Sequence, residues 1–324
     1  MRAPARLRTP VAELVEQATG GTAGSVRAVA RLISLVEDAA PELREVARLL
    51  APRTGRATVL GLTGSPGVGK STTTAALVTA YRAQDRTVGV LAVDPSSPFS
   101  GGALLGDRVR MQSHATDPGV FIRSMATRGH LGGLSEAVPQ ALRVLDAAGC
   151  DVVLLETVGV GQSEVEVASL ADTTLVLLAP GMGDGIQAAK AGLLEVADIF
   201  VVNKADRDGA DSTAREIRHM VSLGEHPPGS WRKPVLKTVA SRGEGVTELL
   251  AAVDGHREWM GATGHLDERR RQRAAREVEG IAVAALRSRL STLRGGAELA
   301  GLAARVAHGE TDPYTAADSL LADL

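Results

Sequence analysis

One stretch of the sequence constrains the fold more than any other. Residues 64–71 read GSPGVGKS, which fits the pattern G-x-x-x-x-G-K-[ST] of a phosphate-binding loop. The residues before it, 57–62, read as a short buried strand, and those after it, 72–82, as an alanine-rich helix. A strand, a glycine-rich loop and a helix in this order are the context that the motif requires, so we expect a nucleotide-binding α/β domain.

The chemistry of the loop follows from its residue types. The glycines let backbone N–H groups close around phosphates, and the start of the helix adds the positive end of its dipole. Lys70 can reach the β- and γ-phosphates, and Ser71 can offer its hydroxyl to Mg²⁺. The residues expected to contact the nucleotide phosphates are Gly64, Ser65, Pro66, Gly67, Val68, Gly69, Lys70, Ser71 and Thr72.

Composition narrows the class of protein. The chain has 324 residues and a net charge of −2, which argues against a nucleic-acid-binding surface. Its aromatic content is only 2%, so the core must be aliphatic. No apolar run is long enough to span a membrane, and no secretory signal is recognisable. The single cysteine, Cys150, is expected to be a buried apolar residue. We therefore expect a cytoplasmic protein with no nucleic-acid or membrane partner.

Short apolar runs alternate with helical stretches from residue 57 onward. The predicted strands are Thr58–Thr63, Thr87–Val93, Val120–Ser124, Val152–Glu156, Thr173–Ala179, Ile199–Asn203 and Val235–Thr238. Runs that are apolar throughout are typical of strands covered on both faces, so we predict an α/β fold with a doubly wound, mostly parallel sheet. Ligands of such sheets bind at the carboxyl ends of the strands.

The predicted domain organisation has three parts. Residues 1–53 form a helical segment, in which Pro41 is expected in the first turn of the third helix. Residues 54–258 form the nucleotide-binding domain, and 259–324 a helical arm. The arginine-rich run 269–273 is expected to be a solvated helix face.

The tetrapeptide Asn203-Lys204-Ala205-Asp206 follows an apolar strand and matches N-K-x-D. The Asp206 carboxylate can accept hydrogen bonds from N1–H and the 2-amino group of guanine, whereas adenine lacks both donors. The aliphatic stem of Lys204 can cover the base. Ala240, after the next strand, is expected to give a backbone N–H to the base. Together these residues favour GTP and GDP over adenine nucleotides.

Acidic residues end two other strands. Glu156 stands where many GTPases carry the aspartate of D-x-x-G, and Gly159 can offer its N–H to the γ-phosphate. Asp94 follows the strand after the phosphate-loop helix and, with Ser71 and Glu156, is a candidate Mg²⁺ ligand. Asp107 is a further candidate, although Asp94 and Asp107 also suit plain turns.

These motifs together resemble one family. They are GSPGVGKS (64–71), VDPSSPFSGGALLGDRVRM (93–111), FIRSMATRGHLGG (121–133), ETVGVGQSE (156–164), GDGIQAAKAG (183–192) and NKAD (203–206). The chain is similar over nearly its whole length to the MeaB/ArgK family of P-loop GTPases, whose human relative is the methylmalonic aciduria type A protein.

The resemblance implies a Mg²⁺-dependent GTPase that serves an adenosylcobalamin-dependent acyl-CoA mutase, usually methylmalonyl-CoA mutase. In this family GTP hydrolysis gates cofactor loading and protects the mutase, and members form homodimers through a C-terminal arm. By the same resemblance Lys70, Asp94, Asp107 and Glu156 are catalytic, and Lys190 belongs to a partner-responsive switch. Members often carry Lys-Lys at this point, whereas this chain has Lys190-Ala191.

Three alternatives stay open at this point. The partner could be a different cobalamin-dependent acyl-CoA mutase. The chain could instead be an ATPase or kinase linked to amino-acid transport, although the N-K-x-D motif speaks against ATP. A nickel metallochaperone GTPase is the third, although the sequence lacks the Cys and His clusters that such proteins usually display.

Overall fold

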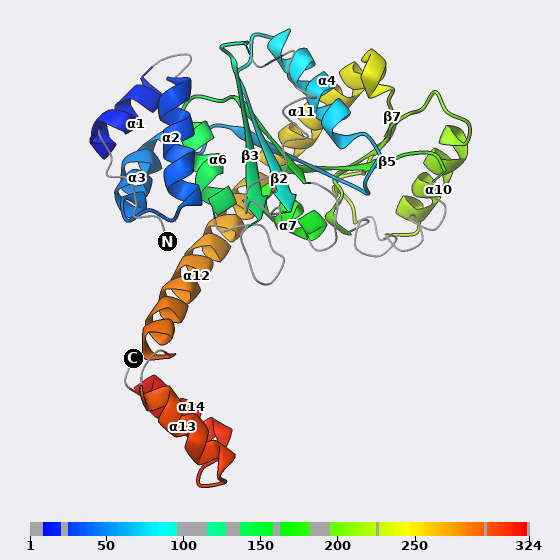
Figure 1. Cartoon of the computed structure of the whole chain (residues 1–324). Helices are drawn as coiled ribbons and strands as arrows, with labels where there is room; N and C mark the ends of the chain where they lie inside the picture. Colours follow the sequence, from blue (N-terminus) through cyan, green and yellow to red (C-terminus); the bar gives the residue numbers. More distant parts are fainter. Residues whose placement is uncertain are drawn as a thin grey trace. The chain divides into compact units, whose positions relative to one another are not determined.

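The computed structural model describes residues 9–20, 25–95, 114, 116–127, 137–157, 163–181, 195–224, 227–294 and 297–322. The chain divides into two compact units, Met1–Arg270 and Arg271–Leu324. The first unit contains the sheet (Figure 1).

Seven strands form a single sheet in the order β3-β2-β4-β1-β5-β6-β7, and every pairing is parallel. They are β1 (Thr58–Thr63), β2 (Val88–Pro95), β3 (Val120–Thr127), β4 (Val152–Thr157), β5 (Thr173–Leu178), β6 (Ile199–Val202) and β7 (Val235–Lys237). All residues of β1, β4, β5 and β6 are buried. This confirms the predicted α/β fold and accounts for the continuous apolar runs, because helices cover both faces of the sheet.

Each face of the sheet has its own layer of helices. The helices α4 (Lys70–Arg82) and α11 (Val246–Thr263) pack on one face, around Leu60, Leu62 and Leu154. On the other face α6 (Ala137–Ala147) and α7 (Ser163–Leu170) pack against Leu155 and its neighbours, and α10 (Ala210–Ser222) packs on β5 and β6. The sheet therefore forms the central layer of three.

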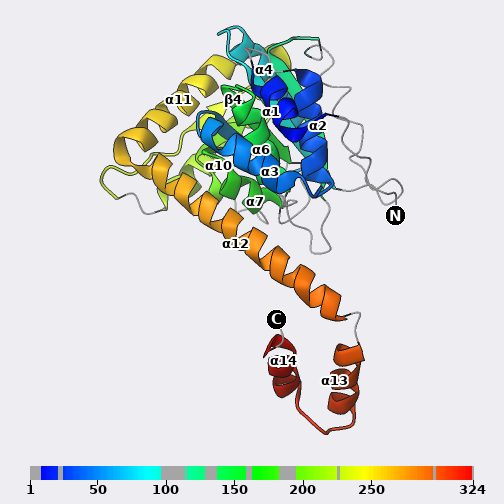
Figure 2. The same ribbon diagram turned by 90° about the vertical axis from the view of Figure 1, so that its left-hand side faces the viewer.

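Three short helices precede the sheet and pack outside α6 (Figures 1 and 2). They are α1 (Val11–Thr19), α2 (Val26–Glu37) and α3 (Leu43–Leu50). The Ser25 side chain caps α2 by accepting a hydrogen bond from the Ala28 amide. The third helix begins at Leu43, so Pro41 lies just outside it and not in its first turn as predicted. A separate turn, closed by the Leu43 amide on the Ala40 carbonyl, occupies that position.

The remaining helices follow α11. They are α12 (His265–Arg294), α13 (Ala297–Ala307) and α14 (Pro313–Ala322), with the unit boundary inside α12. Among the described residues no helix is both long and apolar enough to cross a membrane.

Two residues of the arginine-rich run, Arg269 and Arg270, contradict the prediction of a solvated face, whereas Arg271 and Gln272 are exposed as predicted. Arg269 forms two hydrogen bonds with the carboxylate of Asp198, and Arg270 pairs with Asp172 at 3.1 Å. Both aspartates are buried, and they stand immediately before β6 and β5. The prediction failed because a sequence shows neither which carboxylates are buried nor which side chain will neutralise them.

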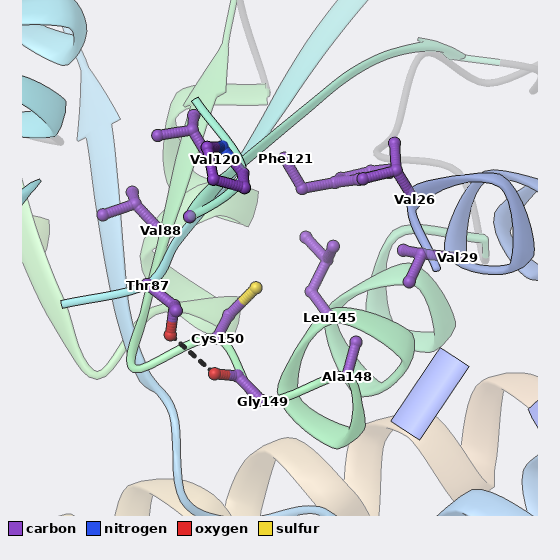
Figure 3. Close-up of a pocket in the computed structure, with 12 residues that line it drawn as sticks. Val26, Val29, Thr87, Val88, Val120, Phe121, Leu145, Ala148, Gly149 and Cys150 are labelled. Carbon is purple, nitrogen blue, oxygen red and sulfur yellow. Dashed lines mark hydrogen bonds between the residues drawn. The ribbon is translucent and has the colours of Figure 1, made fainter. Parts of the chain in front are cut away.

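A small apolar cavity of about 30 Å³ lies at the amino ends of β2 and β3, opposite the carboxyl edge (Figure 3). The Cys150 side chain lines it together with Val29, Phe121 and Leu145. Burial raises the pKa of the Cys150 thiol to about 12, which agrees with the expected apolar role. The cavity has room for only one or two water molecules, so it cannot hold a nucleotide.

Candidate nucleotide-binding site

The phosphate-binding loop leaves β1 at Thr63 and enters α4 at Lys70. Gly64 and Gly69 have positive φ angles, of 138° and 97°. A Cβ on Gly64 would collide with the Leu177 carbonyl of β5, and one on Gly69 with the side-chain amide of Asn203. These two positions therefore require glycine, because the loop passes directly against its neighbours.

Lys70 is the first residue of α4 and is almost wholly buried. Its Nζ donates to the carbonyl oxygens of Gly64, at 2.6 Å, and Ser65, at 3.1 Å. The ammonium group thus lies inside the curve of the loop. The first amides of a helix lack intrahelical acceptors, and together with this cation they form a site for anionic phosphates.

Ser71 and Glu156 meet across the boundary between α4 and β4. The Ser71 hydroxyl donates to Glu156 Oε1 at 2.6 Å, and both side chains are buried. The Thr74 hydroxyl, one helical turn further along α4, lies 2.8 Å from the other carboxylate oxygen, Oε2. The Glu156 side chain is therefore held at both oxygens.

A hydroxyl and a carboxylate at this position are hard oxygen donors of the type that Mg²⁺ takes in nucleotide sites. Because Ser71 donates a hydrogen bond to Glu156, the lone pairs of its hydroxyl oxygen stay available for a metal ion. These residues fit the ion that the sequence predicts.

Asn203 connects the phosphate loop to the end of β7. Its Nδ2 donates to the Val68 carbonyl at 2.9 Å, and its Oδ1 accepts from the Thr238 hydroxyl and the Ala240 amide. With 3% of its surface exposed, the side chain is a fixed link between three loops. Asn203 therefore fixes the loop after β6 against the phosphate loop.

The Ala240 amide differs from its expected role. The sequence assigned this N–H to the base, whereas in the structure it donates to Asn203 Oδ1 at 3.1 Å. The difference arises because the amide faces inward from the short helix η3 (Ala240–Arg242).

Lys204 and Asp206 lie beyond Asn203 at the surface. Lys204 adopts a left-handed backbone conformation, with φ of 55°, and its Nζ donates to the Gly67 carbonyl at 2.6 Å. The stem of Lys204 therefore extends from the loop after β6 to the phosphate loop. Asp206 is partly exposed, and Arg242 lies 3.6 Å from its carboxylate. Sequence reasoning identified Lys204 and Asp206 but missed the neighbouring Arg242.

Four predicted site residues lie wholly or partly outside the described part of the chain. The backbone of Asp94 lies near the carboxyl end of β2, where it pairs with Ala126 of β3, but its side chain is outside the described part of the chain. Asp107, Gly159 and Lys190 also lie outside the described residues. Like Arg242, Thr74 was missed by sequence reasoning, although its spacing of three from Ser71 places both hydroxyls on one helix face.

A glycine-rich loop with a buried lysine, on a parallel sheet whose β6 strand leads into N-K-x-D, defines a P-loop GTPase. Comparison with known proteins identifies the group within this class. The family model described as methylmalonyl Co-A mutase-associated GTPase MeaB matches residues 29–294. The chain therefore belongs to the MeaB family, and it is a GTP-hydrolysing enzyme that binds guanine nucleotides.

Individual relatives agree with this assignment. A protein of Pyrococcus abyssi, named provisionally as a GTPase, is 48% identical over 93% of this chain and 94% of its own. The mouse protein named methylmalonic aciduria type A homolog, mitochondrial, is 36% identical over 78% of this chain and 65% of its own. A crystal structure described as LAO/AO transport system kinase superposes with a TM-score of 0.70 at 27% identity, covering 98% of each chain.

Proposed function

We propose that this GTPase is a chaperone of an adenosylcobalamin-dependent acyl-CoA mutase, with methylmalonyl-CoA mutase as the first candidate. GTP hydrolysis would gate loading of the cobalamin and protect the mutase from inactivation. The observation that carries the proposal is the family match over residues 29–294, which includes both the phosphate loop and the N-K-x-D motif. The name of the mouse relative refers to the same acyl group.

Within this function we propose a role for each group at the site. Lys70 and the backbone N–H groups of residues 64–72, apart from Pro66, bind the β- and γ-phosphates, where charge develops as the terminal phosphoryl group leaves. Asn203, Lys204 and Asp206 hold the guanine base. Ser71, Asp94 and Glu156 would hold Mg²⁺, and the ion would neutralise negative charge on the phosphates.

The remaining proposed residues would respond to the nucleotide or to the partner. Gly159 would contact the γ-phosphate, and Asp107 would approach the metal and phosphates. Lys190 would report binding of the mutase, because the family resemblance places it in the partner-responsive switch. Completion of a GTPase site by a partner can raise kcat by about 10³–10⁵-fold.

The experiment is GTP hydrolysis by the full chain with and without purified methylmalonyl-CoA mutase from the same organism. We expect the mutase to accelerate hydrolysis by at least about tenfold, a small part of what partner completion can supply. Heat-inactivated mutase is the control, and Lys190→Ala should lose most of the acceleration. If the native mutase has no effect while GTP binds tightly, methylmalonyl-CoA mutase is not the partner, and the other acyl-CoA mutases become the candidates.

We further propose that residues 259–324 mediate homodimerisation. Along α12 the apolar side chains Val278, Ile281 and Leu286 are each at least 50% exposed. Exposed apolar side chains gathered on one helix are typical of association surfaces. Sedimentation at micromolar concentration should show a dimer that Ile281→Asp weakens, whereas a monomeric wild-type chain would contradict this. The cytoplasmic location stays a prediction.

A further inference from the structure

The carboxylate of Glu156 accepts a hydrogen bond from a different hydroxyl at each of its two oxygens. Ser71 Oγ lies 2.6 Å from Oε1, and Thr74 Oγ1 lies 2.8 Å from Oε2. All three side chains are buried, and Thr74 has no exposed surface. The carboxylate is thus oriented by two residues spaced three apart on α4.

Threonines in helices often donate to the carbonyl four residues earlier, which would make Thr74 a merely structural residue. Its hydroxyl does lie 3.1 Å from the Lys70 carbonyl. It has one proton, however, and the carboxylate is both closer and charged, so Oε2 is the stronger acceptor. Thr73, equally buried, donates to the Gly69 carbonyl at 3.0 Å and has no carboxylate partner within the described part of the chain.

The length of the acidic side chain agrees with this arrangement. An aspartate, which many GTPases carry here, is one methylene shorter than Glu156 and would not span from the end of β4 to both hydroxyls. The longer glutamate has one more rotatable bond, so it needs a second contact to keep one oxygen directed at Ser71.

We propose that Thr74 is a positioning residue for Glu156, and that it sets the Mg²⁺ affinity of the nucleotide complex. This inference rests on the proposed role of Glu156 toward Mg²⁺. Without the Thr74 hydroxyl, Oε2 would lose this hydrogen bond at a buried position, and the carboxylate would turn away from Ser71. Loss of such an outer contact costs about 10–100-fold in metal affinity.

The test compares Thr74→Val, which removes the hydroxyl with little change of shape, with wild type and with two controls. Thr74→Ser keeps the hydroxyl, and Thr73→Val removes a buried hydroxyl that donates to a backbone carbonyl. Each full-length variant is melted with GDP while Mg²⁺ is titrated from an EDTA-buffered zero. The readouts are the Mg²⁺ concentration that gives half of the increase in Tm, and the affinity for GDP in EDTA.

We expect Thr74→Val to need about tenfold more Mg²⁺ than wild type, with GDP affinity in EDTA within about twofold. Thr74→Ser and Thr73→Val should resemble wild type. An unchanged Mg²⁺ requirement in Thr74→Val, or an equal shift in Thr73→Val, would overturn the inference. If Thr74→Val does not fold, Thr74→Ala carries the same comparison.

The same titration distinguishes an error in the metal role of Glu156 from an error in the positioning role of Thr74. If Mg²⁺ has no effect on the GDP complex of wild type, the proposed metal role of Glu156 is wrong. If Mg²⁺ stabilises wild type and Thr74→Val equally, that role survives and only the assignment of Thr74 is wrong.

Discussion

The ion pair between Arg269 and Asp198 allows one prediction to be worked out in detail. Asp198 is 5% exposed and accepts hydrogen bonds from the Thr174 amide and from both terminal nitrogens of Arg269, at 2.7 and 2.8 Å. His256, with no exposed surface, lies 3.4 Å from the same carboxylate. Replacing Arg269 with methionine keeps an apolar stem but removes the main positive charge beside a buried carboxylate.

The expected loss of stability follows from the burial of the two partners. Removing one partner of a fully buried ion pair costs about 3–5 kcal/mol. The side chain of Arg269 is 37% exposed, so water replaces part of the lost interaction. We therefore expect Arg269→Met to lower the free energy of unfolding by about 2–3 kcal/mol.

The same variant should change how stability depends on pH. Burial, with the charge of Arg269 adding to it, lowers the pKa of His256 to about 4 from 6.5. The unfolded chain therefore takes up this proton more readily than the folded one. The contribution of His256 to the free energy of unfolding is therefore fully present above pH 6.5. It is lost progressively as the pH falls toward 4, by about 3 kcal/mol in total. In Arg269→Met the pKa of His256 rises, so this acid-side loss should become smaller.

Urea unfolding followed by tryptophan fluorescence measures both effects. The two tryptophans of the chain lie beside the pair, since Trp231 donates to the Asp198 carbonyl and both rings lie within 6 Å of His256. Arg276→Met, at an exposed position of the same helix, is the control, with an expected change below about 0.5 kcal/mol. An equally small change in Arg269→Met would refute the reasoning.

Four further predictions concern the nucleotide site and the cysteine. Lys70→Ala should retain its fold but lose phosphate affinity, and unchanged GTP hydrolysis would rule out the assigned site. Asp206→Asn should relax guanine preference and admit xanthine nucleotides, so retained GTP selectivity in a competition assay would overturn the base assignment. Gly69→Ala should weaken GTP binding by about tenfold or more, because the added Cβ would collide with the side-chain amide of Asn203. The positive φ at this position also costs a residue with a side chain about 1–2 kcal/mol. Wild-type affinity in this variant would show that the loop can shift. Cys150 should resist alkylation at pH 8 in the folded chain and react after unfolding in urea, since burial raises its pKa to about 12; rapid labelling of the native protein would contradict this.

The fold was predictable because its signals are local. The strands β1, β4, β5 and β6 consist mainly of apolar residues, and such runs were recognisable without knowledge of their neighbours. The order of the strands was not predictable in this way. In the sheet, β4 lies between β2 and β1. The alternation of apolar runs with helical stretches along the sequence is compatible with this strand order and with others.

The candidate site shows the same division. Lys70, Ser71, Asn203 and Asp206 were found from their spacing alone, since the chemistry of phosphate and guanine recognition demands those residue types at those intervals. The inward-facing Ala240 amide was not foreseen. The sequence does not show whether this N–H meets the guanine base or the Asn203 side-chain oxygen.

The sequence by itself determined that this chain has a parallel α/β sheet with a phosphate-binding loop and a guanine-recognition motif. Tertiary structure decided which side chains neutralise or orient one another across long separations. Thr74 meets Glu156 82 residues away, and Arg269 meets Asp198 71 residues away. Such pairs leave no local pattern, because a buried carboxylate requires only that some donor reach it, and the packing of the elements determines which one does.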